Sequence, residues 1–243
     1  MQHDPRATAT ATVATYGQPQ VVGDLSMEAR STFMVRVFTH LLGALLAFTM
    51  IEVGIFYLGW HVTITNYVME QSWLIFLGAF MVAGWIAGRA AHTAKSRLAQ
   101  YAALVGYVLA EALLFVPLLT MADRQAGGQM IASAAYVSLA GFAGLAAIAI
   151  FSRKDFSFLG AALKWGGFCA LGLIIGSSII GGFELGMMFN VGMVALAGGA
   201  ILFDTQRIFR EYPEDRYVGA SLQLFASIAL LFWYVLRIFM SRD

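Results

Sequence analysis

The sequence predicts an all-α, polytopic integral membrane protein in which seven transmembrane helices form one bundle. The first observation is composition, because 60% of the 243 residues are hydrophobic and only 12% are charged, at a mean hydropathy of +0.75. Soluble domains carry about 25% charged residues, so this chain is expected to have lipid as its solvent. The second is that the apolar residues gather in segments of about 20 residues, the length that crosses a bilayer as a helix.

Seven apolar segments follow an N-terminal stretch that has no hydrophobic core. Residues 1–26 are rich in Ala, Thr and Gln and are predicted to form a flexible cytoplasmic tail, with residues 27–243 forming the transmembrane domain. The tail lacks the apolar region of a cleavable signal peptide, so we expect the first span to act as the targeting signal. The predicted spans cover residues 34–59, 73–90, 99–121, 130–152, 158–182, 186–208 and 218–239.

Small residues four positions apart occur in the second, fifth and sixth predicted spans. Because lipid supplies no hydrophobic force between helices, close backbone approach at small residues favours their packing. We interpret these pairs as packing positions within one bundle. They are Gly84 with Gly88, Gly172 with Gly176, and Ala195 with Gly199. In the third span, Pro117 removes a backbone hydrogen bond and predicts a kink toward the outer end.

The positive charges predict an orientation with the N-terminus inside and the C-terminus outside. Lysine and arginine concentrate in cytoplasmic connections, and this arrangement places eleven of them inside and three outside. The inner set is Arg6, Arg30, Arg36, Arg89, Lys95, Arg97, Arg153, Lys154, Arg207, Arg210 and Arg216, and the outer set is Arg124, Arg237 and Arg242.

Enzymatic and nucleic-acid-binding functions find no support in the sequence. The net charge of +1 gives no basic surface for nucleic acid. The chain has a single cysteine, Cys169, and no metal-binding HExxH motif, and the stretch from Gly219 to Gln223 lacks the second glycine of a nucleophile elbow. Asp204 is the one aspartate well inside a span, whereas an aspartyl protease needs two. We therefore expect no enzyme and no cofactor.

Five ionisable residues fall within the predicted spans: Glu52, Glu111, Lys164, Asp204 and Arg237. Burying such a group in a bilayer costs several kcal/mol unless it is paired or hydrated, so deep acids are candidates for function. Lys164 and Arg237 have long stems and are interpreted as reaching toward an interface. The deepest acid is Glu111, and it either hydrogen-bonds a neighbouring helix or takes part in a cation or proton pathway.

The sequence leaves two interpretations of Asp204 open. It either fixes helix packing near the cytoplasmic end, pairing with Arg207, or it titrates along a cation or proton pathway. Its neighbourhood, GGAILFDTQRI over residues 198–208, occurs with three further segments: RVFTHLLGALLAFT at 36–49, SRKDFSFLGAAL at 152–163 and LLFWYVLRIF at 230–239. In this order and spacing they resemble the Bax inhibitor-1 (TMBIM) family, and the loop and the terminal SRD look closest to its bacterial YccA-like branch.

The resemblance implies a bundle of seven helices in which one central helix is surrounded by the others, and for several members a pH-sensitive calcium leak gated by two aspartates that share a proton. Asp204 matches the first aspartate, but Ser227 stands where the second is expected. Two carboxylates about 3 Å apart cannot both ionise, whereas a serine only donates a hydrogen bond. The proton-sensing set here is therefore Asp204, Ser227 and, as a substitute partner, Glu111, with Arg207 and Arg237 as candidate latch or pairing residues.

The YccA-like pieces imply a different role in the bacterial inner membrane. Proteins of that branch are similar in associating with the membrane AAA protease FtsH and its regulators. The predicted tail over residues 1–26 suits this role, because a processive ATPase needs an unstructured segment. The first hypothesis is thus a modulator of the FtsH complex, and the alternative is a calcium or cation leak with altered pH gating, in which Ca²⁺ is present only in transit. Ser227 favours the first. Oligomeric state is left open.

Overall fold

The computed structural model describes residues 20–71, 75, 78, 81–82, 84, 88–89, 96–152, 154–180 and 185–241. These residues form a short 3-10 helix, η1 (Val22–Asp24), and the α-helices α2 (Met27–Tyr57), α3 (Trp60–Glu70), α5 (Arg97–Ala126), α6 (Gly128–Phe151), α7 (Leu159–Ile180), α8 (Met187–Glu211) and α9 (Tyr217–Met240). All except η1 and α3 are long and apolar enough to cross a membrane. This confirms six predicted spans and the all-α fold; the predicted span at 73–90 lies largely outside the described residues.

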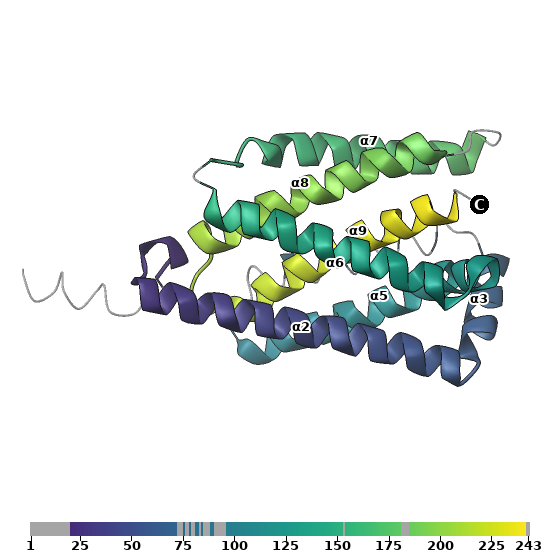
Figure 1. Cartoon of the computed structure of the whole chain (residues 1–243), viewed down its shortest axis with the longest axis horizontal. Coiled ribbons are helices and arrows are strands. Elements are labelled where there is room, and N and C mark those ends of the chain that lie inside the picture. The colour runs from purple at the N-terminus through teal and green to yellow at the C-terminus, as the bar shows by residue number, and fades with distance from the viewer. Residues whose placement is uncertain are drawn as a thin grey trace, which may run out of the picture.

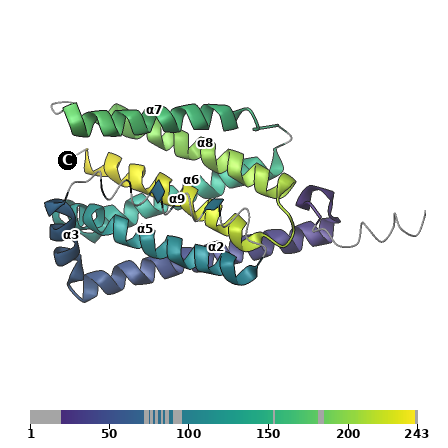
Figure 2. The ribbon, with the colours of Figure 1, turned by 180° about the vertical axis from the view of Figure 1, so that it is seen from behind.

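Helix α9 occupies the middle of the bundle and contacts α2, α5, α6 and α8 (Figures 1 and 2). Its residues Tyr217 to Leu222 are all buried, so more than one of its faces is covered by other helices. Phe225 shows this position, because its ring meets Phe48 of α2 at 6.1 Å and Tyr107 of α5 at 6.2 Å between centroids. The central helix implied by the resemblance is therefore α9.

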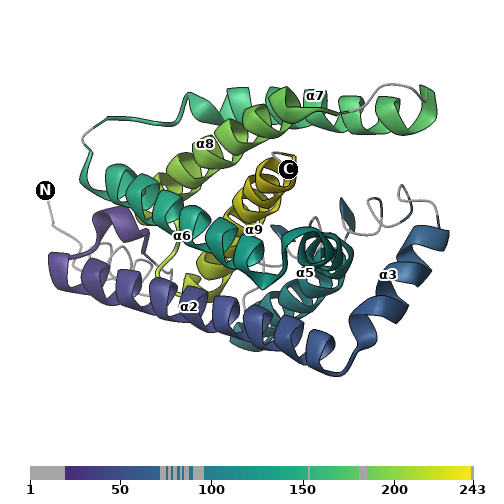
Figure 3. The same ribbon diagram turned by 45° about the vertical axis from the view of Figure 1, so that its right-hand side comes forward.

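Helix α7 lies at the edge of the bundle and packs on α8 (Figure 3). Within the bundle, 56% of the most apolar stretch of α9 is buried, against 6% for α7. The close approach of α7 to α8 uses glycines: a Cβ added at Gly166 would collide with Leu196, and one at Gly160 would lie 2.9 Å from the Phe203 ring. Most of α7 therefore faces lipid.

The small-residue pairs predicted for packing are only partly correct. Gly199 packs against Leu163 of α7, where an added Cβ would meet the side chain at 3.4 Å. A Cβ at Gly172 or Gly176 would meet nothing within 4 Å, so this pair was wrongly predicted to be a contact. The four-residue spacing alone does not tell which face of α7 meets its neighbour.

The first helix starts earlier than predicted. It begins at Met27, seven residues before the apolar run starting at residue 34, because Ser26 caps it by accepting a hydrogen bond from the Ala29 backbone N–H at 3.3 Å. At the other end of α2, Gly59 adopts φ +73°, which turns the chain into α3. Sequence analysis did not predict α3, which packs on α5 with a hydrogen bond from Thr65 to Thr120 of 3.1 Å.

Residues 20–25 belong to the folded body, which corrects the predicted tail boundary at residue 26. Val22 is fully buried, and its N–H donates to the Tyr212 carbonyl at 2.8 Å. The Glu214 N–H in turn donates to the Gln20 carbonyl at 3.0 Å. These backbone bonds tie the segment to the connection between α8 and α9, and residues 1–19 of the predicted tail lie outside the described residues.

Candidate functional site

A cavity of about 710 Å³ lies between α5, α7, α8 and α9. Its walls combine aromatic and aliphatic side chains with an unusual number of polar groups for the interior of an apolar bundle. The polar and charged residues that line it are Glu111, Ser177, Ser178, Asp204, Gln223, Ser227 and Arg237. Two carboxylic acids from different helices therefore share one space within the membrane domain.

Asp204 is held by two side chains of α9. The Ser227 hydroxyl donates a hydrogen bond of 2.8 Å to Asp204 Oδ2, and the Gln223 amide donates one of 3.3 Å to the same oxygen. Ser227 and Gln223 lie one helical turn apart, so they face α8 together. Asp204 is 7% exposed. Ser227 thus contacts Asp204 directly, as the second aspartate of the family pair is expected to do. It supplies a hydrogen-bond donor and no second charge.

Glu111 is 3% exposed and comes from α5. It hydrogen-bonds the hydroxyl of Tyr107, one turn earlier on the same helix. Among the described residues no hydrogen bond joins it to Asp204. Glu111 therefore lines the cavity with Asp204 but does not take the place of the second aspartate as its direct partner.

The two arginines predicted as latch or pairing residues occupy different environments. Arg207 lies near the C-terminal end of α8, with Nε 3.4 Å from Glu211 Oε2, one turn on. Among the described residues Arg207 makes no ion pair with Asp204. Arg237 is half-buried on α9 and lines the cavity that contains both acids. Neither position assigns a function to the arginine, so both roles stay predictions.

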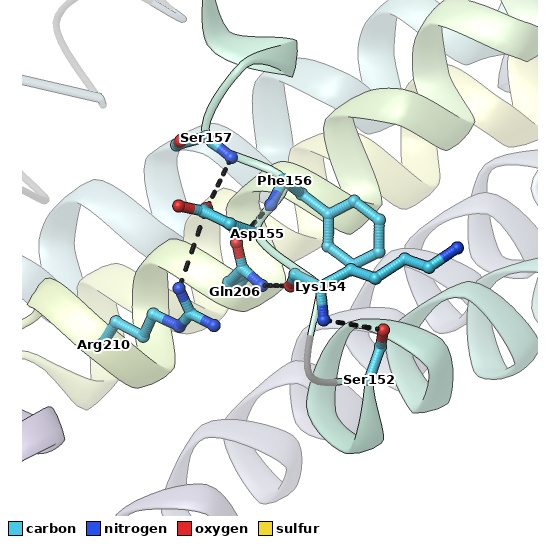
Figure 4. Close-up of polar contacts among 7 residues, drawn as sticks. All are labelled: Ser152, Lys154, Asp155, Phe156, Ser157, Gln206 and Arg210. Atoms are coloured by element: carbon cyan, nitrogen blue, oxygen red, sulfur yellow. Dashed lines mark hydrogen bonds and ion pairs between the residues drawn. The ribbon is translucent and has the colours of Figure 1, made fainter.

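Gln206, which sequence analysis did not single out, connects the site to the α6–α7 loop (Figure 4). Its Oε1 accepts from the Phe156 backbone N–H at 2.7 Å, and its Nε2 donates to the Lys154 carbonyl at 2.8 Å. Gln206 follows Asp204 by two residues on α8. The family-like segments at 152–163 and 198–208 therefore pair in space, and their co-occurrence was the available signal for this contact.

Asp155, in the α6–α7 loop, also holds this loop against α8. It accepts a hydrogen bond of 2.9 Å from the Ser157 backbone N–H and lies 3.7 Å from the Arg210 guanidinium (Figure 4). The Ser157 backbone N–H, helped by the Ser157 hydroxyl and by Arg210, lowers the pKa of Asp155. Its charged form is thus the one that fits this loop.

Replacing Gln206 with leucine is expected to loosen the α6–α7 loop. The change removes two hydrogen bonds and leaves the Phe156 N–H without its acceptor, a loss of about 1–3 kcal/mol. Hydrogen exchange at residues 154–157 should become faster, and the apparent Tm should fall. Gln129→Leu, at an exposed position, is the matched control and should change neither. Unchanged exchange in the Gln206 variant would contradict the proposed anchoring.

The fold and cavity define the class of this molecule as a polytopic helical membrane protein with an acidic internal site. A family model described as "Inhibitor of apoptosis-promoting Bax1" matches residues 30–243. The chain belongs to the Bax inhibitor-1 family. This confirms the resemblance deduced from the four sequence segments.

Relatives occur in a virus and in bacteria. A Golgi anti-apoptotic protein of Vaccinia virus (strain Lister) is 28% identical over 177 residues, which is 71% of each chain. An uncharacterized protein of Pseudomonas aeruginosa is 34% identical over 113 residues, 46% of this chain and 50% of that protein. One of Campylobacter jejuni is 34% identical over 146 residues, 57% of this chain and 62% of that protein. The chain thus spans about half to two thirds of these bacterial relatives.

Proposed function

We propose that this protein provides a passage for cations, with Ca²⁺ as cargo, across a bacterial inner membrane. The observation that carries the proposal is that Asp204 and Glu111 line one cavity inside the bundle. Ionisable groups at membrane depth are costly and mark ion pathways when they face a polar cavity. Hydroxyls of Ser177 and Ser178 extend the polar lining and suit a hydrated cation.

Asp204 is the group proposed to interact with the passing ion. Both of its hydrogen bonds from described residues fall on Oδ2, which leaves Oδ1 for a cation. Ser227 and Gln223 do not titrate in the physiological range, so they fix the carboxylate without forming a proton switch. The proposed passage therefore lacks a switch made of two carboxylates that share a proton.

Calcium-indicator fluorescence in sealed proteoliposomes tests this proposal. Vesicles that contain the protein should take up Ca²⁺ faster than protein-free vesicles of the same lipid composition. The contact between Asp204 and Ser227 contains a single carboxylate, so uptake should lack the steep pH dependence of two carboxylates that share a proton. Equal uptake with and without protein would overturn the proposal.

Association with the membrane protease FtsH is a second proposal, resting on the YccA-like segments. The attachment of residues 20–25 to the α8–α9 connection favours it, because force on residues before 20 would act directly on Val22 and its bond to Tyr212. Deleting residues 2–19 is expected to lengthen the half-life of the protein in cells by removing the segment that the ATPase grips. Pulse-chase in cells with and without FtsH provides the control. An unchanged half-life in cells with active FtsH would count against this handle.

A further inference from the structure

A second cavity, of about 660 Å³, lies between α2, α5, α6 and α9. It borders another side of the central helix and contains neither Asp204 nor Glu111. Its walls are mainly aliphatic and aromatic, with Phe48 and Phe56 of α2 and Phe225 and Phe232 of α9 among them. Cavities of about 300–1,000 Å³ with an apolar lining and few polar groups are typical of sites for small organic ligands.

Glu52 is the unusual member of this lining. It lies on α2 and is only 6% exposed. Both of its carboxylate oxygens are buried, and no described residue offers either of them a hydrogen bond. A buried acid normally has such a partner, because an unsatisfied buried polar group costs about 1–3 kcal/mol and more when charged. The missing partner must come from outside the described side chains.

The charge of the cavity favours a positively charged partner. Its described lining contains two acids, Glu52 and Asp123, and no lysine, arginine or histidine. Aromatic rings attract cations through their faces, so Phe48, Phe56 and Tyr57 add to this preference. A phosphate or other anion in the same place would oppose ionisation of both acids and would find no basic side chain among the described lining residues.

We propose that this cavity binds a lipophilic organic cation, with its positive charge beside Glu52 and its apolar body among the aromatic side chains. The ligand would enter from the bilayer, since the cavity is formed within the membrane-spanning helices and Leu46, Val53 and Leu139 at its wall are exposed to lipid. This site is independent of the proposed cation passage, because it lies on other helix faces and accepts an apolar ligand in place of a hydrated ion.

Two ions of nearly the same shape and opposite charge test the proposal. Tetraphenylphosphonium and tetraphenylborate are applied to the full chain in lipid nanodiscs, and binding is measured by equilibrium dialysis against empty nanodiscs. The phosphonium should bind saturably at about one site per protein, and the borate should show no saturable binding. Equal binding of both ions would overturn the proposal, because recognition would then depend only on the shape and apolarity of the ligand and not on its charge.

Variants assign the charge recognition to Glu52. Glu52→Gln keeps the side-chain shape and should weaken phosphonium binding about tenfold or more, and Asp123→Asn should weaken it less because Asp123 is exposed at the cavity edge. Ala135→Phe fills the cavity and should abolish binding without a change of charge. Glu70→Gln, at an exposed position on α3, is the matched control. Phosphonium binding that survives both Glu52→Gln and Ala135→Phe would refute the site.

Discussion

Replacing Asp204 with asparagine is expected to lower calcium uptake into proteoliposomes about tenfold or more. A carboxylate and a cation about 4 Å apart attract each other by several kcal/mol near a protein surface, and asparagine removes this attraction while keeping the side-chain shape. The amide can still accept the hydrogen bond from Ser227 that now reaches Oδ2 at 2.8 Å. The packing of α8 on α9 should therefore persist, which size-exclusion profiles and thermal unfolding of the purified variant would check.

Two further variants separate the charge of Asp204 from general effects of acidic residues. Glu111→Gln removes the second acid of the cavity and should reduce uptake by a smaller factor, since Glu111 is already engaged by Tyr107. Glu70→Gln, on the exposed surface of α3, should leave uptake unchanged. Full uptake by the Asp204 variant would exclude this aspartate from the conduction pathway.

Replacing Ser227 with aspartate is expected to make calcium uptake depend on pH. The new carboxylate would lie in direct contact with Asp204, because Ser227 Oγ is already 2.8 Å from Asp204 Oδ2. Two carboxylates this close share a proton over part of the pH range and repel each other when both ionise. We expect uptake by the variant to change about tenfold between about pH 5.5 and pH 8, which corresponds to about 1.4 kcal/mol in the balance between conducting and closed forms.

Two further measurements, on the wild type and on the Ser227→Asn variant, are needed to interpret this result. Wild-type uptake should change less than that of the variant over the same pH range, since its Asp204 contacts come from a hydroxyl and an amide. Ser227→Asn provides the matched control, because it adds similar volume without a second carboxyl beside Asp204 and should leave the pH profile as in the wild type. A steep pH profile in the wild type would show that another pair of groups forms the switch.

The sequence predicted the spans well because each is a long apolar run, a signal that depends on composition alone. It missed α3, since an eleven-residue helix with mixed polarity resembles a connecting loop. It also assigned residues 20–25 to the tail, because their contacts with Tyr212 and Glu214 are backbone hydrogen bonds between distant parts of the chain. Such bonds leave no pattern in residue type.

The candidate site was only partly predictable. Asp204 and Glu111 stood out because acids are rare in apolar helices, and the family pattern indicated that position 227 would lie beside Asp204. Gln206 gave no such signal, since its two bonds go to backbone atoms of the α6–α7 loop. Glu52 was recognised as a deep acid, but the absence of a hydrogen-bond partner for it among the described residues depends on the packing of four helices around it.

The central position of α9 has a consequence for biosynthesis. This helix contacts α2, α5, α6 and α8, yet it follows all of them in the chain. During translation the earlier helices therefore enter the bilayer before their main common partner has left the ribosome. Until α9 is inserted, the inward faces of these helices are uncovered in lipid. Asp204 of α8 then lacks its hydrogen bonds from Ser227 and Gln223. A nascent chain stalled before α9 would expose these surfaces, and membrane quality control would recognise it as incomplete.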